Sequence, residues 1–102
     1  MGAIDFFTSA TGPDLTTAFN TARAQDRNDY GSGGYTGTLA EKHSVALIDE
    51  PRRSEGDAVA RARELLLGDD PRVSDKWGPA GALPIATDDG TDGWLLFGVA
   101  PY

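Results

Sequence analysis

Two stretches of the chain carry apolar residues at helical spacing. The first stripe follows the i, i+3, i+4, i+7 pattern of one helix face and comprises Leu15, Ala18, Phe19 and Ala22. Gly12-Pro13-Asp14 precedes it and is typical of a helix start, and Gly31 predicts its end. Ser54 and Asp57 form a variant capping box before the second apolar face, which comprises Ala58, Val59, Ala62, Leu65 and Leu66. Gly68 predicts the end of this second helix.

Segments rich in β-branched and aromatic residues predict strands at residues 3–9, 42–48, 83–87 and 94–99. The partly continuous apolar run in 42–48 favours a central, well-buried place in a sheet. Pro84 favours an edge position or a late start for the third strand. The turn formers of residues 88–93 predict a hairpin between the last two strands. Residues 35–39 leave open a further short strand that pairs with residues 43–48.

The predicted order of elements is strand, helix, strand, helix, strand, strand. We therefore expect residues 1–102 to form a single compact domain of the α+β class, with two helices packed on one small sheet. Because a hairpin joins the last two strands, this sheet is expected to be mixed or mainly antiparallel. Trp94 lies in an apolar strand and is expected in the core. Trp77 lies in a Gly-Pro loop, where it either covers the edge of the core or marks an interface.

The net charge of −7 changes which partners are expected. The chain has 16 Asp and Glu residues against 9 Lys and Arg residues. Nucleic-acid binders usually carry the opposite sign, so DNA or RNA is not expected as a partner. An acidic surface most simply favours solubility. Presentation of carboxylates to a basic partner is the alternative, although the acidic residues are spread along the whole chain.

Cysteines and long apolar runs are missing from the sequence. The absence of cysteine removes disulfides, thiolate metal sites and cysteine nucleophiles. No apolar run approaches the ~20 residues needed to cross a bilayer. The N-terminus has neither the basic start nor the apolar core of a signal peptide. We therefore expect a cytoplasmic protein without a membrane partner.

A loop rich in glycine and tyrosine, between the first helix and the second strand, is the main candidate site. Glycine loses much conformational freedom on ordering, so a loop of this composition suggests a structural or functional reason. Its main-chain N–H groups can form an anion nest, and exposed tyrosines make good recognition surface. The loop follows a helix, unlike nucleotide-binding phosphate loops, and a helix stop with tight turns is the structural alternative. The predicted ligand- or partner-binding residues are Tyr30, Gly33, Gly34, Tyr35, Thr36, Lys42 and Trp77.

Three other groups of residues are candidate sites with weaker patterns. His43 is the only histidine, and Glu41 would share its side of a strand and could orient it as a general base. The cluster at residues 88–93 lacks the ligand spacing of a calcium loop, so a hairpin turn and no metal is expected. The one local basic concentration could bind an anionic partner or form a solvated face, and it comprises Arg52, Arg53, Arg61 and Arg63. No catalytic residue is assigned, and no cofactor is expected.

Three segments of the chain resemble motifs in short, uncharacterised proteins of actinobacteria and their phages. They are Gly34-Tyr-Thr-Gly-Thr-Leu-Ala-Glu-Lys42, Lys76-Trp-Gly-Pro-Ala-Gly81 and Gly93-Trp-Leu-Leu-Phe-Gly98. The resemblance covers most of the chain. It implies a compact single domain and a phage accessory role, and it brings with it no known activity and no functional residues.

These observations favour a non-enzymatic binding protein that presents the glycine-tyrosine loop, Trp77 and an acidic exterior. If the chain is phage-encoded, the expected partner is a host protein in the host cytoplasm, such as a defence factor, which it would inhibit or redirect. A binder or sponge for an anionic, nucleotide-like small molecule is the first alternative. A small enzyme that uses His43 and Glu41 is the second. A homodimer also stays open, because edge strands and aromatic loops often pair across a dimer.

Overall fold

The computed structural model describes residues 2–30, 34–88 and 90–102 of the chain. In chain order, its elements are β1 (Ala3–Thr11), α1 (Leu15–Tyr30), the short 3₁₀ helix η1 (Leu39–Glu41), β2 (Val45–Leu47), α2 (Glu55–Leu67), β3 (Ala80–Ala86) and β4 (Asp92–Pro101). Apart from η1, this is the predicted order of strands and helices. The α+β class and the two helices packed on one sheet are confirmed within the described residues.

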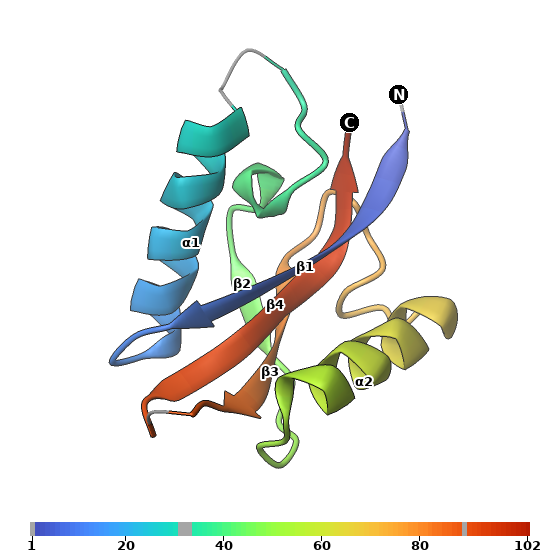
Figure 1. The fold of residues 1–102 in the computed structure, drawn as a ribbon. Helices are drawn as coiled ribbons and strands as arrows, with labels where there is room; N and C mark the ends of the chain where they lie inside the picture. Colours follow the sequence, from blue (N-terminus) through green and yellow to red (C-terminus); the bar gives the residue numbers. More distant parts are fainter. Residues whose placement is uncertain (1, 31–33, 89) are drawn as a thin grey trace.

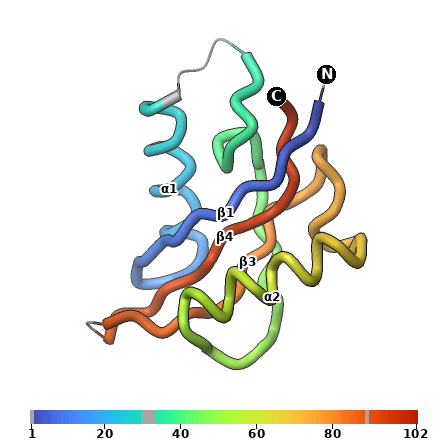
Figure 2. Tube along the Cα trace, turned by 45° about the vertical axis from the view of Figure 1, so that its right-hand side comes forward, coloured from blue at the N-terminus to red at the C-terminus, as the bar shows by residue number. Residues whose placement is uncertain are grey.

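The strands form one mixed sheet in the order β1-β4-β3-β2. Both β1 and β3 pair with β4 in antiparallel fashion, whereas β2 pairs with β3 in parallel. The parallel pair needs a crossover connection, which α2 supplies. Figures 1 and 2 show α1 on one face of the sheet and α2 on the other, with the two chain ends side by side. The predicted hairpin between β3 and β4 is confirmed.

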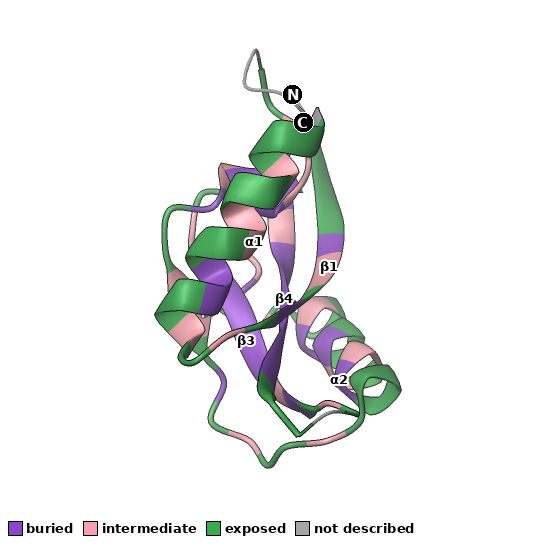
Figure 3. Ribbon diagram, turned by 60° about the vertical axis from the view of Figure 1, so that its left-hand side comes forward, coloured by how far each residue is buried: buried purple, intermediate pink, exposed green. Residues whose placement is uncertain are grey.

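Two hydrophobic clusters, one on each face of the sheet, hold the layers together. In β4, Leu96 belongs to the cluster beneath α1, while its neighbour Phe97 belongs to the cluster beneath α2. A strand that is buried on both faces has a continuous apolar sequence, which explains the Trp-Leu-Leu-Phe run. Figure 3 shows these buried positions along β3 and β4. Trp94 is 7% exposed and lies in the core, as predicted.

The ends of both helices follow from their capping residues. A side-chain oxygen of Asp14 accepts a hydrogen bond from the N–H of Thr17 at 2.8 Å, and this bond lowers the pKa of the Asp14 carboxyl. The Ser54 hydroxyl accepts from the N–H of Asp57 at 3.1 Å, and Gly68 ends α2. The predicted starts of both helices and the end of α2 are therefore confirmed. Gly31, the predicted end of the first helix, lies outside the described residues.

A strand within residues 42–48 is confirmed, but the prediction that it lies in the centre of the sheet and is well buried was wrong. β2 has only 3 residues, lies at the edge of the sheet and leaves Leu47 52% exposed. The apolar run instead reflects Ile48, which leaves the strand and is fully buried beneath α2. The structure describes all of residues 35–39, and the short strand considered there is absent. Thr38 is instead the N-cap of η1, which begins at Leu39.

The prediction from Pro84 was also wrong, because β3 is an inner strand that begins at Ala80. β2 pairs with β3 only as far as Ala82. Beyond that point the chain has left the strand, and the Pro84 carbonyl accepts a single bond from the N–H of Arg53 at 3.4 Å. The N–H and C=O of one strand residue point to the same side, so the N–H that proline lacks would face this loosely paired segment.

No helix within the described ranges combines the length and the apolar character needed to cross a membrane.

Candidate functional site

An exposed pair of aromatic rings joins two loops that are far apart in the sequence. The rings of Tyr35 and Trp77 meet edge to face, with centroids 5.7 Å apart and an interplanar angle of 71°. The Lys76 ammonium nitrogen lies 5.4 Å from the centroid of the Trp77 ring. Tyr35 is 50% exposed and Trp77 is 58% exposed. We call these three residues the aromatic platform, because they offer two large apolar side chains and one cation to solvent.

Lys42 fixes the loop that carries Trp77. Its side chain is 1% exposed, and its ammonium donates to the carbonyls of Asp75 at 3.2 Å, Lys76 at 3.3 Å and Gly78 at 3.0 Å. An ammonium has three N–H donors, so these bonds use its full capacity. Burial lowers the pKa of Lys42, and the nearby Asp75 carboxylate partly offsets this effect. The buried charge therefore holds the main chain on both sides of Trp77.

The same loop is also held by its own turns. The N–H of Trp77 donates to a side-chain oxygen of Asp75 at 2.9 Å, and Gly78 N–H donates to the Asp75 carbonyl at 2.9 Å. Earlier in the loop, the Asp70 carboxylate binds Arg72 through two side-chain bonds of 3.0 and 2.8 Å. The Arg72 side chain is the main cause that lowers the pKa of Asp70 to about 2. These contacts give Trp77 a defined position on the surface.

A second set of hydrogen bonds holds the segment that carries Tyr35. The Glu41 carboxylate accepts from the N–H of Thr36 at 3.0 Å and from its hydroxyl at 2.9 Å. Thr36 and Thr38 share a hydroxyl–hydroxyl bond of 2.7 Å. Gly37 has a φ of 69°, which favours glycine, and its N–H donates to the Pro101 carbonyl at 2.9 Å. The residue that follows Tyr35 is thus bonded to η1, and Gly37 is bonded to the end of β4.

The structure brings together only some of the predicted site residues. Tyr35 and Trp77 are in contact, and Gly34 next to Tyr35 is exposed. Lys42 is buried and its ammonium is bonded to three carbonyls of the Trp77 loop, so it is not presented to a surface ligand. The Thr36 hydroxyl is hydrogen-bonded to the Glu41 carboxylate and to the Thr38 hydroxyl. Gly33 and the side chain of Tyr30 lie outside the described residues.

Two residues important to the platform were not among the predicted site residues. Asp75 shapes the turn that carries Trp77, and Lys76 lies over the indole ring. The sequence did offer a signal for Asp75, since an aspartate two residues before a turn position often bonds the main chain there. No comparable local signal marks Lys76.

The residues considered for general-base chemistry are placed differently from the prediction. Glu41 lies in η1 and His43 lies between η1 and β2, so the alternation of a strand does not relate them. In the part of the chain that the structure describes, no hydrogen bond joins these two side chains, and Glu41 instead bonds Thr36. Across residues 2–30, 34–88 and 90–102, no cluster of His, Cys, Asp and Glu is arranged to hold a metal ion.

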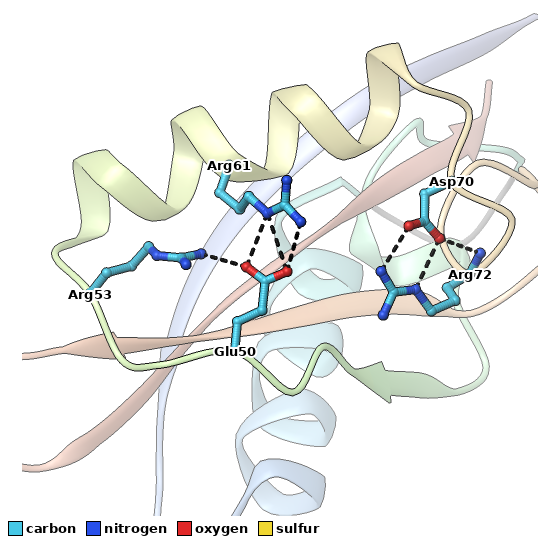
Figure 4. A network of polar contacts seen from close by, with 5 residues as sticks. All are labelled: Glu50, Arg53, Arg61, Asp70 and Arg72. Atoms are coloured by element: carbon cyan, nitrogen blue, oxygen red, sulfur yellow. Dashed lines mark hydrogen bonds and ion pairs between the residues drawn. The ribbon is translucent and has the colours of Figure 1, made fainter.

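Three of the four clustered arginines serve as internal ties, as Figure 4 shows for Arg53 and Arg61. Arg61 binds both oxygens of Glu50 at 3.0 and 2.9 Å, and Arg53 binds the same carboxylate at 2.9 Å. These bonds, chiefly those from Arg61, lower the pKa of Glu50 to about 2. Arg52 donates to the carbonyls of Ile85 and Gly93. This group therefore fastens α2 and the preceding turn to the sheet.

Comparison with protein-family models, with curated proteins and with solved structures finds no match to this chain.

Proposed function

We propose that this chain is a non-enzymatic binding protein that uses Tyr35 and Trp77 to anchor a protein partner. The observation that carries the proposal is the exposed, mutually packed pair of rings on two loops that are each tied to the body of the domain. Tyrosine and tryptophan are enriched among the residues that dominate binding energy at protein interfaces. A platform that is already ordered loses little conformational entropy on binding.

The internal ties distinguish this site from an ordinary exposed loop. Lys42 bonds three carbonyls of the Trp77 loop, and Glu41 bonds Thr36 beside Tyr35. Because Lys42 and Glu41 are close in sequence, one short segment around η1 orders both halves of the platform. Burial of an ammonium costs free energy because the charge loses its hydration. Hydrogen bonds from the ammonium to protein acceptors are needed to offset this cost. The chain thus devotes a costly group to the placement of two exposed rings.

The chemistry of the partner follows from the charge of this protein and from its aromatic rings. With a net charge of −7, the chain favours a partner whose contact surface is basic at the rim and apolar at the centre. Under the resemblance to proteins of phages, the proposed partner is a host protein, including a defence factor, that the chain inhibits or redirects. The ligand-binding alternative has less support, because the Lys42 ammonium is occupied by carbonyls of the chain itself.

Capture from a host lysate, read by native mass spectrometry, tests this proposal. Wild-type protein is expected to retain a host protein at a defined stoichiometry, and Tyr35→Ala or Trp77→Ala should weaken binding of that protein by about 1–3 kcal/mol. Leu47→Ala is the matched control, since Leu47 is similarly exposed, at 52%, but lies on β2. Equal binding by the platform variants and the wild type would remove these rings from the interface. A small mass adduct in place of a protein would support the ligand-binding alternative.

A further inference from the structure

The outer edge of β1 carries a row of main-chain groups that point away from the sheet. Gly2 and Tyr102 exchange two hydrogen bonds, and β1 pairs with β4 residue by residue from Ala3 to Thr11. In an antiparallel pair, every second residue bonds the neighbouring strand. The even-numbered residues therefore bond β4, and the N–H and C=O groups of the odd-numbered residues face outward. Within the described residues, no main-chain hydrogen bond is made by Ala3, Asp5, Phe7 or Ser9 on that outer side.

The two edges of the sheet differ in how far they are protected against pairing. The edge strand β2 has only 3 residues, which limits any addition to it. β1 has 9 residues, and its unbroken register with β4 leaves no bulge. It contains neither proline nor lysine, the residues that commonly block an edge, and its one charged residue is Asp5. Of the two edges of the described sheet, β1 is thus the one that is long, regular and accessible.

The surface beside β1 carries exposed apolar side chains and charged side chains that form no ion pair within the described residues. A groove between β1 and α2 is lined by Asp5, Phe7, Arg63 and Leu67. Leu67 is 87% exposed, and the Arg63 guanidinium carbon lies 5.5 Å from the centroid of the Phe7 ring. Asp5 and Arg63 make no ion pair with any described residue. On the other face of β1, Ile4 is 51% exposed.

We propose that two copies of this chain form a dimer by pairing their β1 strands in antiparallel fashion. The two-fold axis passes at Phe6, so that Asp5 of one copy faces Phe7 of the other. This register places Asp5 beside Arg63 of the second copy, because Arg63 lies over Phe7. The symmetry creates the same pair twice.

Charge selects this register over its neighbours. An axis at Asp5 would place the two Asp5 carboxylates opposite each other, which is unfavourable. An axis at Phe7 would place Asp5 opposite Ser9, whose hydroxyl is bonded to the Glu55 carboxylate. The Asp5 carboxylate of one copy would then lie close to the Glu55 carboxylate of the other, which is unfavourable. The axis at Phe6 avoids both repulsions and gives Ile4 the side chain of Thr8 as its neighbour across the interface.

The proposed interface is built mainly from the main chain. Facing odd-numbered residues between Ala3 and Ser9 supply roughly eight hydrogen bonds across the two-fold axis. The two sheets then form one continuous sheet, because α2 packs chiefly on β3 and β4 and meets β1 only through side chains such as Arg63 over Phe7. Such an interface is small by the standard of stable dimers, so the dimer is expected to depend on protein concentration. It uses no residue of the aromatic platform, and its failure would leave the proposed function untouched.

Sedimentation velocity over a range of concentrations, with charge-swapped variants, tests the dimer. The wild type is expected to pass from monomer to dimer, with no species larger than the dimer. Asp5→Arg and Arg63→Asp should each raise the dissociation constant about tenfold or more, because each places like charges together. The double variant Asp5→Arg/Arg63→Asp should restore it to within about threefold of the wild type. Asp5→Pro removes an outward N–H and should abolish the dimer, and circular dichroism checks that each variant is folded.

Each contrary outcome overturns the proposal. A wild type that remains monomeric to about 1 mM, far above the range of specific interfaces, would show that β1 does not pair with itself. A dimer that survives Asp5→Pro would lie on another surface. Loss of the dimer in both single variants without recovery in the double variant would refute the proposed register.

Discussion

Replacement of Lys42 by methionine is the sharpest test of how the platform is built. Methionine has a similar length and an apolar side chain, so it fills the same buried volume while it removes the ammonium. The change deletes the bonds to the carbonyls of Asp75, Lys76 and Gly78. It leaves the rings of Tyr35 and Trp77 in place. Lys42→Met therefore separates the ordering of the platform from its composition.

The expected cost follows from the three hydrogen bonds and from the burial of the charge. A hydrogen bond to a charged group contributes about 1.5–3 kcal/mol, but removal of the ammonium also removes its desolvation cost. The freed carbonyls lie in a partly exposed loop, where water can reach some of them. We therefore expect Lys42→Met to lower the free energy of unfolding by about 2–3 kcal/mol. For a domain of this size, that loss corresponds to a fall in Tm of roughly 10–20 °C.

Urea unfolding of Lys42→Met and Lys76→Met measures this effect under matched conditions. Lys76 undergoes the same chemical change, but its side chain lies over the Trp77 ring, so a cost below about 1 kcal/mol is expected. If the wild type retains a host protein as proposed, the Lys42 variant should bind that protein more weakly at temperatures where the variant remains folded. Equal costs for the two variants, or a cost below about 1 kcal/mol for Lys42→Met, would refute the role of Lys42 as the anchor of the loop.

Two further predictions concern the body of the domain. A Cβ at Gly81 would lie 2.5 Å from a methyl carbon of Val73, so Gly81→Ala should destabilise the protein by about 1–3 kcal/mol in urea unfolding. Gly56→Ala is the control, since its Cβ meets nothing within 4 Å and should stabilise α2 by about 0.5 kcal/mol; equal effects would contradict the packing argument. The bonds from Arg61 are the main cause that lowers the pKa of Glu50 from 4.5 to about 2 in the folded protein. The contribution of the ionised Glu50 carboxylate to stability is therefore complete above pH 4.5 and is lost as the pH falls toward 2. Glu50→Gln should flatten the dependence of stability on pH in that window, and an unchanged acid slope would show that the pair contributes nothing.

The helices were predictable because their signals are local. Each has an apolar stripe at helical spacing and a side-chain oxygen that caps its first turn. In the first helix, Ala18 and Phe19 are 1% and 3% exposed, as the stripe required. Apolar residues that recur at helical spacing within one segment show which face of that helix is buried. The β3–β4 hairpin was predictable for the same reason, since its turn residues and both strands are adjacent in sequence.

The place of each strand in the sheet was not predictable, because it depends on pairing between distant segments. An apolar run in residues 42–48 favours a buried strand, but it does not distinguish a central strand from a short edge strand followed by a buried residue. Ile48 is buried in the cluster beneath α2, although it lies outside strand β2. Pro84 is tolerated in an inner strand only because the neighbouring chain departs after Leu47. Neither fact has a signature in the local sequence.

The platform shows the same division between composition and arrangement. Tyr35 and Trp77 attract notice as aromatic residues in glycine-containing loops, and both are half exposed as such loops favour. Their contact spans 42 positions of the sequence, and no periodicity predicts it. The residue type of Lys42 suggested a ligand donor, since lysine is rarely buried. Its burial reverses that role: the charge that would attract a ligand at the surface instead binds three carbonyls and fixes the loop of Trp77. The proposed recognition surface therefore depends on a residue that a partner bound to the two rings need never touch. Variants at Lys42 are expected to alter binding through the order of the rings rather than through lost contact.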